Sequence, residues 1–217
     1  ARIGAPANVR LACQLRPPPG HYRVALLLPA AAGPVEAYRR QPQAHGGERY
    51  IAVLFADIRG FTPLTEALAR ELGPQRGSEE ITRHLNLVYD AVIAEVHGHG
   101  GSVLGFSGDA ITCWFDESAP AADAASAAAR AAAGALAMQA AMQSFATLTT
   151  PAGAVIALAS KVAVAGGPVR RLLVGDPRRQ YLDVLAGGLM DELAAAEHLA
   201  GRGEVIVSAA VAAELAG

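Results

Sequence analysis

The sequence predicts an α+β sandwich, with a mostly antiparallel sheet and helices flanking it. Three observations lead to this prediction. Residues 51–56 are an uninterrupted apolar run, typical of a short strand that is buried on both faces. Two further short apolar runs flank residues 107–109, which is a hairpin pattern. The predicted elements follow in the order strand, helices, hairpin, helix, hairpin, helix, strand.

Composition excludes several classes of protein. The chain has 217 residues, enough to bury a sizeable core, and it is 52% hydrophobic and 18% charged. Because its net charge is −2, we expect no nucleic-acid partner. Residues 24–32 are too short for a membrane span and contain Pro29, so we expect no membrane partner. Cys13 and Cys113 lack metal or disulfide spacing, which indicates a reduced, cytoplasmic setting.

The N-terminal third divides from the rest by composition. We expect an extension at residues 1–33, a linker rich in Gln, Gly and Pro at 34–49, and the main domain at 50–217. Segments 9–17 and 22–30 read as two strands packed on that domain. The RLACQ sequence resembles the tail of a plant-type [2Fe–2S] ferredoxin domain, where Cys13 would match the last cluster ligand. The other three ligands are absent, so we expect no iron–sulfur cluster on this chain. The chain begins at Ala1 and not at a methionine, which is compatible with a longer native protein.

Two helices are predicted after the first strand. The first covers residues 64–72 and is broken by Gly73, Pro74 and Gly77. Ser78 is the predicted N-cap of the second, which covers residues 79–97 and ends at a run of glycines. Its apolar residues at positions 81, 85, 88, 93 and 96 lie roughly along one face.

The remaining elements follow from local signals. A hairpin covers residues 102–115, and an alanine-rich helix capped by Ser118 runs to about residue 145, with Pro120 near its start. Since Leu136, Met138 and Met142 are its larger apolar residues, we expect this helix to pack close to the sheet. Strands at 155–164, 169–174 and 180–185, a helix at 189–199, a strand at 204–207 and a helix at 209–215 complete the prediction.

Two aspartates stand at strand ends that the predicted sheet brings together. Asp57 ends the first strand, where a lone carboxylate faces a steep desolvation cost unless positive charge meets it. Asp109 lies at the hairpin turn, and the hairpin packs beside the first strand. Two Mg²⁺ ions between the carboxylates and a triphosphate would offset their repulsion. The plainer interpretation, that each aspartate caps a turn, accounts less well for the pair and the adjoining residues 59–62.

The segments FADIRGFT, FSGDA and GRGEVIVS, in this order and spacing, resemble the catalytic domain of class III nucleotidyl cyclases over residues 50–217. The resemblance implies a ferredoxin-like, palm-like sandwich. It implies that Asp57 and Asp109 bind two Mg²⁺ or Mn²⁺ ions, with the carbonyl of Ile58 as a further ligand. The phosphates of a nucleoside triphosphate would be held by Gly60, Phe61, Thr62 and Gly108. The family's reaction is attack of the ribose 3′-oxygen on the α-phosphate, which releases pyrophosphate.

The sequence departs from the family pattern at the base and transition-state positions. Where the family has a purine-reading lysine four residues before the second metal aspartate, this chain has Gly105. The positions of the family's asparagine and transition-state arginine are Asp191 and Ala195. Lys161, the only lysine, is on a different predicted strand and cannot replace the purine-reading residue.

The pattern is most similar to the first cyclase domain of the soluble, bicarbonate-responsive type. In that type the first domain supplies the metals, and a second domain supplies base recognition, the asparagine and the arginine. Gly105 and Ala194 also lack the charges that help bind bicarbonate there. We therefore expect a partner cyclase domain, in the same longer chain or on another subunit.

Three interpretations stay open at this point. The leading one is the metal-bearing half of a cyclase, acting on ATP in preference to GTP, although base choice would rest with the partner. The second is a catalytically inactive pseudo-cyclase that binds nucleotide or dimerises to regulate another protein. The third, a redox-coupled cyclase, depends on RLACQ alone. Cyclic-dinucleotide synthases share the sandwich, but their GG-[DE]-[DE]-F turn is absent.

Overall fold

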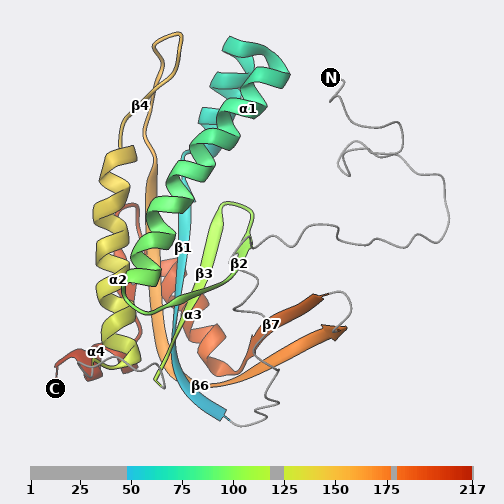
Figure 1. Cartoon of the computed structure of the whole chain (residues 1–217). Coiled ribbons are helices and arrows are strands. Elements are labelled where there is room, and N and C mark those ends of the chain that lie inside the picture. Colours follow the sequence, from blue (N-terminus) through green and yellow to red (C-terminus); the bar gives the residue numbers. More distant parts are fainter. Residues whose placement is uncertain (1–47, 118–124, 177–179, 217) are drawn as a thin grey trace. The chain divides into compact units, whose positions relative to one another are not determined.

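The computed structural model describes residues 48–117, 125–176 and 180–216. Its main sheet has the strand order β2-β3-β1-β6-β7 (Figure 1). Strand β8 pairs with β6 in parallel. The other pairings in this sheet are antiparallel, as predicted. The strands of the main sheet are β1 Glu48–Arg59, β2 Ser102–Ser107, β3 Ala110–Asp116, β6 Ala159–Asp176, β7 Gln180–Ala186 and β8 Val205–Val207. A separate pair consists of β4 Leu148–Thr149 and β5 Val155–Ile156.

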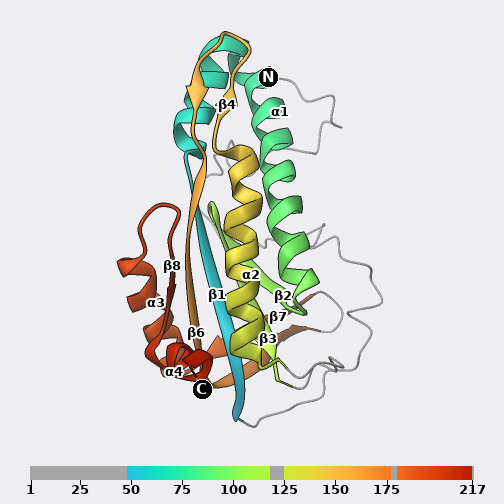
Figure 2. The ribbon, with the colours of Figure 1, turned by 90° about the vertical axis from the view of Figure 1, so that its left-hand side faces the viewer.

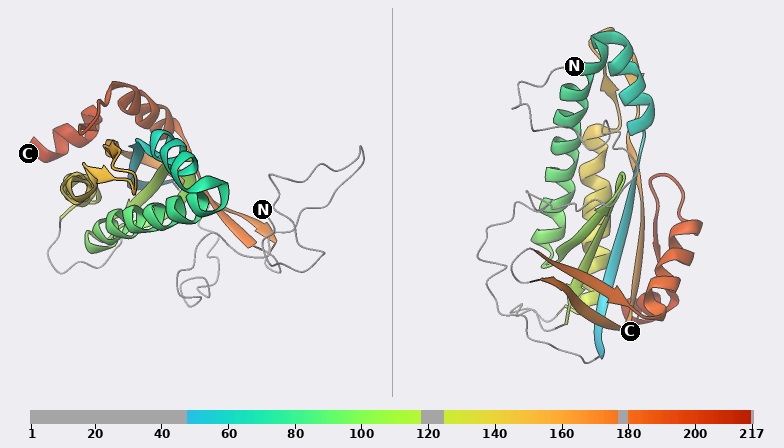
Figure 3. Two further views of the ribbon diagram at one scale, coloured as in Figure 1. Left: turned by 90° about the horizontal axis from the view of Figure 1, so that it is seen from above. Right: turned by 90° about the vertical axis from the view of Figure 1, so that its right-hand side faces the viewer.

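Helices cover both faces of β1. The helices are α1 Phe61–Gly98, α2 Ala127–Met142, the short η3 Gln143–Phe145, α3 Gly188–Leu199 and α4 Ala209–Ala216. Ala52, Leu54, Ala56 and Ile58 are buried in the cluster that includes residues of α1 and α2. Alternate residues of β1 belong to a second cluster with α3 (Figures 2 and 3). Because side chains alternate along a strand, this confirms that β1 is buried on both faces.

Helix α1 differs from the two helices that the sequence predicted. It begins at Phe61, earlier than expected, and its break is at Gly73, where φ is 80°. Ser78 is not an N-cap, because it lies inside the helix and its hydroxyl donates to the carbonyl of Pro74 at 2.7 Å. Gly77 has a packing role: a Cβ there would lie 2.9 Å from the Leu68 carbonyl oxygen. The two parts of α1 thus fold against each other where only glycine fits.

Helix α2 begins later than predicted. Its N-cap is Ser126, whose hydroxyl accepts a hydrogen bond from the amide of Ala129 at 3.1 Å. Ser118 and Pro120 lie outside the described residues. The prediction of close packing is confirmed, since Met138 and Met142 are buried together with a row of alanines. Leu136, by contrast, is 63% exposed.

Strand β6 is one strand of 18 residues where two were predicted. It continues through Gly166, Gly167 and Pro168 because β1 pairs with it along the whole stretch. On its other side, β8 pairs only with 162–164 and β7 only with 170–176. Pro168 therefore sits where its missing N–H interrupts no ladder on that side. The later elements α3, β8 and α4 match the predictions, whereas the predicted strands and linker of residues 1–47 lie outside the described residues.

Candidate active site

Strand pairing brings the two predicted aspartates to the same edge of the sheet. Strands β1 and β3 pair with Asp57 opposite Ala110, the residue after Asp109. The amide of Ile58 donates to the carbonyl oxygen of Asp109 at 3.2 Å, which ties the hairpin turn to the end of β1. Gly108 forms the turn with φ 64°. The side chain of Asp57 is only 14% exposed, whereas Asp109 is exposed.

The loop after Asp57 leads directly into the first turn of α1. Gly60 has φ 106°, and a Cβ there would lie 2.5 Å from the carbonyl oxygen of Ala157. Because α1 begins at Phe61, the amides of Phe61 and Thr62 belong to a helical first turn that has no acceptor within the helix. The Phe61 side chain is buried and anchors the turn. Amides at a helix N-terminus suit phosphate oxygens, so the geometry agrees with the predicted use of this loop.

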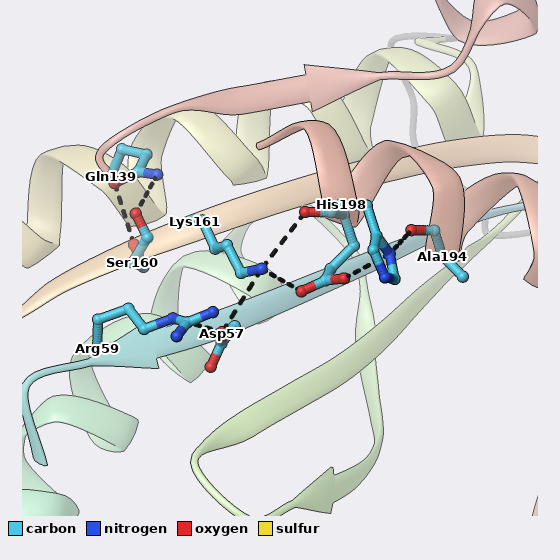
Figure 4. A network of polar contacts seen from close by, with 8 residues as sticks. Asp57, Arg59, Gln139, Ser160, Lys161, Ala194 and His198 are labelled. Carbon is cyan, nitrogen blue, oxygen red and sulfur yellow. Dashed lines mark hydrogen bonds and ion pairs between the residues drawn. The ribbon is translucent and has the colours of Figure 1, made fainter. Parts of the chain in front are cut away.

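Two side-chain cations meet the Asp57 carboxylate. Arg59 lies 2.7 Å from Asp57 Oδ2 through its Nε, and Lys161 Nζ lies 3.8 Å from the same oxygen (Figure 4). Lys161 also forms an ion pair with Glu197 of α3. The sequence placed Lys161 on a different strand from the purine-reading position, and it does lie on β6. Its register opposite Asp57 was not predicted, because strand partners this far apart in sequence leave no local signal.

Tyr89 of α1 is a residue that sequence reasoning missed. Its hydroxyl is buried and, among the described residues, has no hydrogen-bond partner. Burial raises the pKa of Tyr89, and the negative charges of Asp109 and Asp57 raise it further. Its ring packs edge-on against Phe106 with 5.1 Å between centroids. The hydroxyl is thus held within electrostatic reach of both carboxylates. A single tyrosine in a predicted helix gave no indication that it lies near the two carboxylates.

The residues at this edge fit a divalent metal. Among the described residues there is no cluster of three or more His, Cys, Asp or Glu side chains, so an all-protein cage is not formed. Mg²⁺ commonly binds through one or two carboxylates and completes its shell with water and substrate phosphates. Asp57 and Asp109 supply such a pair beside a phosphate-suited helix terminus. Two cations already lie beside Asp57, and the buried Tyr89 hydroxyl has no hydrogen-bond partner among the described residues.

The three positions that depart from the family pattern are accessible or uncrowded. Asp191 and Ala195 are both exposed on α3, away from its buried residues. A Cβ on Gly105 would have no neighbour within 4 Å. A lysine would therefore find room in strand β2, and the glycine is not explained by packing.

Solved structures of cyclases share this fold. The guanylyl cyclase Cya2 superposes with a TM-score of 0.63 and 25% identity, covering 79% of this chain and 81% of that one. The adenylyl cyclase CyaB from P. aeruginosa gives a TM-score of 0.60 and 22% identity, covering 78% and 81%. The chain is thus similar to class III nucleotidyl cyclase domains, whose fold it shares.

The chain is also similar to curated proteins. The adenylate cyclase type 10 of Mus musculus is 27% identical over 157 residues, which are 72% of this chain and 9% of the mouse protein. The chain thus spans about a tenth of the length of that relative. An uncharacterised protein of Mycobacterium tuberculosis is 36% identical over 74 residues, 34% of this chain and 12% of that protein. No protein-family model matches the sequence. Among the described residues, no helix is both long enough and apolar enough to cross a membrane.

Proposed function

We propose that this chain is the metal-bearing half of a nucleotidyl cyclase. It would convert a nucleoside triphosphate, ATP in preference to GTP, into a 3′,5′-cyclic nucleotide and pyrophosphate. The observation that carries the proposal is the placement of Asp57 opposite Ala110, the residue after Asp109, beside the N-terminus of α1. A module that only dimerises has no use for this combination, which disfavours the pseudo-cyclase alternative. The similarity to adenylate cyclase type 10 supports the choice of ATP.

In this proposal each group at the edge has one task. Asp57, Asp109 and the carbonyl of Ile58 hold two Mg²⁺ or Mn²⁺ ions, which, when bound, lower the pKa of the ribose 3′-hydroxyl and stabilise the leaving group. The amides of residues 60–62 and of Gly108 hold the phosphate oxygens. The 3′-oxygen forms its bond to the α-phosphorus as the bond to the pyrophosphate oxygen breaks. Arg59 and Lys161 place positive charge beside the triphosphate.

The site needs a second cyclase domain because three roles have no residue here. Gly105 offers nothing to the base, and Asp191 cannot donate a hydrogen bond as an asparagine amide does. Ala195 leaves the charge on the α-phosphate without an arginine, a contact worth about 10³-fold or more in rate in phosphoryl transfer.

An exposed apolar face supports a partner domain. Leu172, Val174, Leu182 and Val184 are all exposed on the β6–β7 ribbon, where they stand as directly opposed pairs. Exposed apolar patches of this kind mark interaction surfaces. Among structurally similar proteins, one guanylyl cyclase domain from Blastocladiella emersonii is described as dimeric, and one from Catenaria anguillulae was solved with GTP.

Complementation tests the proposal. The purified chain alone should show essentially no turnover of ATP or GTP with either metal. It should become active when mixed with a cyclase domain that carries the lysine, asparagine and arginine but whose own metal aspartates are replaced by alanine. Asp57→Ala should abolish the activity of the mixture, and Asp90→Ala, an exposed aspartate of α1, should not. Robust production of cyclic nucleotide by the chain alone would contradict the half-site, and inactivity of every mixture would contradict catalysis.

A further inference from the structure

One lysine ammonium is shared between two carboxylates at the candidate site. Lys161 Nζ pairs with a carboxylate oxygen of Glu197 and lies 3.4 Å from the main-chain carbonyl oxygen of the same residue. The Oδ2 of Asp57 is 3.8 Å from it on the other side (Figure 4). Glu197 thus makes the closer contact, and Asp57 keeps the looser one. The lysine is held toward α3 and away from the predicted metal ligand.

The three side chains are shielded from solvent, so their charges interact strongly. Lys161 is 12% exposed, Asp57 14% and Glu197 21%. Partly buried pairs are screened much less by salt than exposed ones. The hydrogen bond from Lys161 is the largest cause of the lowered pKa of Glu197, which agrees with a carboxylate that stays charged.

The backbone positions on both sides of this contact are fixed. Leu193 and Ala196 are buried and hold α3 on the sheet next to Glu197. Lys161 lies on β6, and its neighbour Ser160 is buried and bonded to Gln139 of α2 through its hydroxyl at 3.0 Å (Figure 4). The two backbone segments that carry Lys161 and Glu197 are therefore anchored, and the ammonium lies between the carboxylates of Glu197 and Asp57.

We propose that Glu197 is a positioning residue that holds the Lys161 ammonium off Asp57 and thereby raises the affinity of Asp57 for divalent cations. This inference rests on the proposed metal-binding function of Asp57. A divalent ion must compete for Asp57 Oδ2 with Arg59, at 2.7 Å, and with Lys161. Without the Glu197 carboxylate, Lys161 turns to Asp57 as its remaining anionic partner, and the site also loses one negative charge. Both changes weaken metal binding.

A purely structural role for the ion pair makes a different prediction. If the Lys161–Glu197 pair only fastens α3 to the sheet, its loss lowers stability and leaves metal affinity unchanged in the folded protein. The affinity for Mn²⁺ therefore separates the two roles. Activity of the loaded enzyme is not needed as a readout.

The experiment uses the full chain and Mn²⁺ alone as the probe, with free Mn²⁺ measured by electron paramagnetic resonance. Glu197→Gln should lower the Mn²⁺ affinity about tenfold, the scale expected from one nearby unit charge on a divalent ion. Glu197→Asp should retain part of the affinity. The matched control is Glu80→Gln, which removes a paired carboxylate on α1 and should have no effect.

Because Lys161 is the only lysine, protein labelled with isotopes in lysine side chains gives one lysine signal by nuclear magnetic resonance. That signal should shift in metal-free Glu197→Gln and should broaden when Mn²⁺ is added to the wild type. Lys161→Met should raise the Mn²⁺ affinity, and in that background Glu197→Gln should have a smaller effect. If Glu197→Gln fails to fold, the inference is tested by the expected increase in the Mn²⁺ affinity of Lys161→Met.

Two outcomes overturn the inference separately from the proposed function. If Asp57→Asn abolishes Mn²⁺ binding but folded Glu197→Gln binds as the wild type does, the metal site stands and the role of Glu197 is wrong. If Lys161→Met binds Mn²⁺ as tightly as the wild type or more weakly, the role of Glu197 is likewise wrong. If Asp57→Asn binds Mn²⁺ like the wild type, the proposed metal site itself is wrong, and the inference falls with it.

Discussion

At the scale of single residues, Asp57 is the centre of the site. It lies near the end of β1, after the buried residues 51–54 and 56, and within an ion-pair distance of Arg59 and Lys161. These cations offset the cost of keeping a carboxylate at the edge of the core. A divalent ion can take over the same task, and the arrangement therefore predicts a measurable linkage between metal binding and stability.

Mn²⁺ together with a nonhydrolysable nucleoside triphosphate should raise the melting temperature of the wild-type chain. At ligand concentrations about 100 times the dissociation constant, linkage adds about 2.7 kcal/mol to the free energy of unfolding. Asp57→Ala should lose most of this shift, and the exposed Asp90→Ala should keep it. A mutant shift equal to that of the wild type would place the metal elsewhere.

The stability contributed by Glu197 should depend on pH. The hydrogen bond from Lys161 lowers the pKa of Glu197 below its ordinary value of 4.5. A lowered carboxyl pKa contributes stability above the ordinary value, and this contribution is lost as the pH falls through 4.5 and then through the lowered pKa. The wild type should therefore be more stable than Glu197→Gln near neutral pH.

The difference between the two proteins in free energy of unfolding should shrink in acid. Urea unfolding at a series of pH values checks this, and groups common to both proteins cancel in the comparison. A difference that stays constant from neutral to strongly acidic pH would mean that the ion pair is not the source of the stability.

At the scale of elements, α1 and the β4–β5 pair are fastened together by one carboxylate. Glu71 of α1 accepts a hydrogen bond from the hydroxyl of Thr150 at 2.6 Å and from the amide of Ala152 at 3.0 Å. Thr150 is buried, and its hydroxyl oxygen also accepts from the amide of Ala154. Figure 2 shows the β4–β5 hairpin beside the first part of α1. Glu71 thus organises the turn that joins β4 to β5.

Glu71→Ala should destabilise the domain by about 1–3 kcal/mol, because it leaves the buried Thr150 hydroxyl without its charged acceptor. Chemical denaturation measures the change. The control is Glu79→Ala, an exposed glutamate on the second part of α1 whose one hydrogen bond, from Gln75, is long at 3.4 Å. Equal effects of the two substitutions would show that Glu71 contributes no more than a surface charge.

At the scale of the whole molecule, the described residues bury two apolar clusters on opposite faces of the sheet. The first involves α1 and α2, and the second involves α3. Among the described residues, the members of the two clusters extend from Ile51 to Val211.

Removal of residues 1–33 should leave the cyclase fold intact, because residues Ala44–Gly217 form a compact unit. Far-ultraviolet circular dichroism should retain the helical signal of the remaining domain, and thermal unfolding should stay cooperative. Loss of a cooperative transition in the shortened chain would instead show that the N-terminal segment is part of the core.

The sequence by itself predicted most of the described helices and strands, and it singled out the two carboxylates of the candidate site. The run at 51–56, the turn at Gly108 and the break at Gly73 were all predicted, because burial periodicity and backbone preference are local properties. The sequence predicted that Asp57 and Asp109 lie close together, because each stands at the end of a predicted strand. The start of α2 at Ser126 and the continuity of β6 could not be predicted, because the local sequence does not distinguish between alternative caps or between alternative strand partners.

Only the tertiary structure decided what surrounds Asp57. Lys161 lies opposite Asp57 because β6 pairs with β1 in one register, and a slip of one residue would turn the lysine to the other face. Glu197 pairs with Lys161 because α3 packs on the same sheet. Tyr89 lies close enough to feel the charges of both carboxylates because its ring packs against Phe106 of the hairpin. The periodicity of apolar residues indicates which face of an element is buried. The residues that pack against that face, however, come from chain segments far away in the sequence.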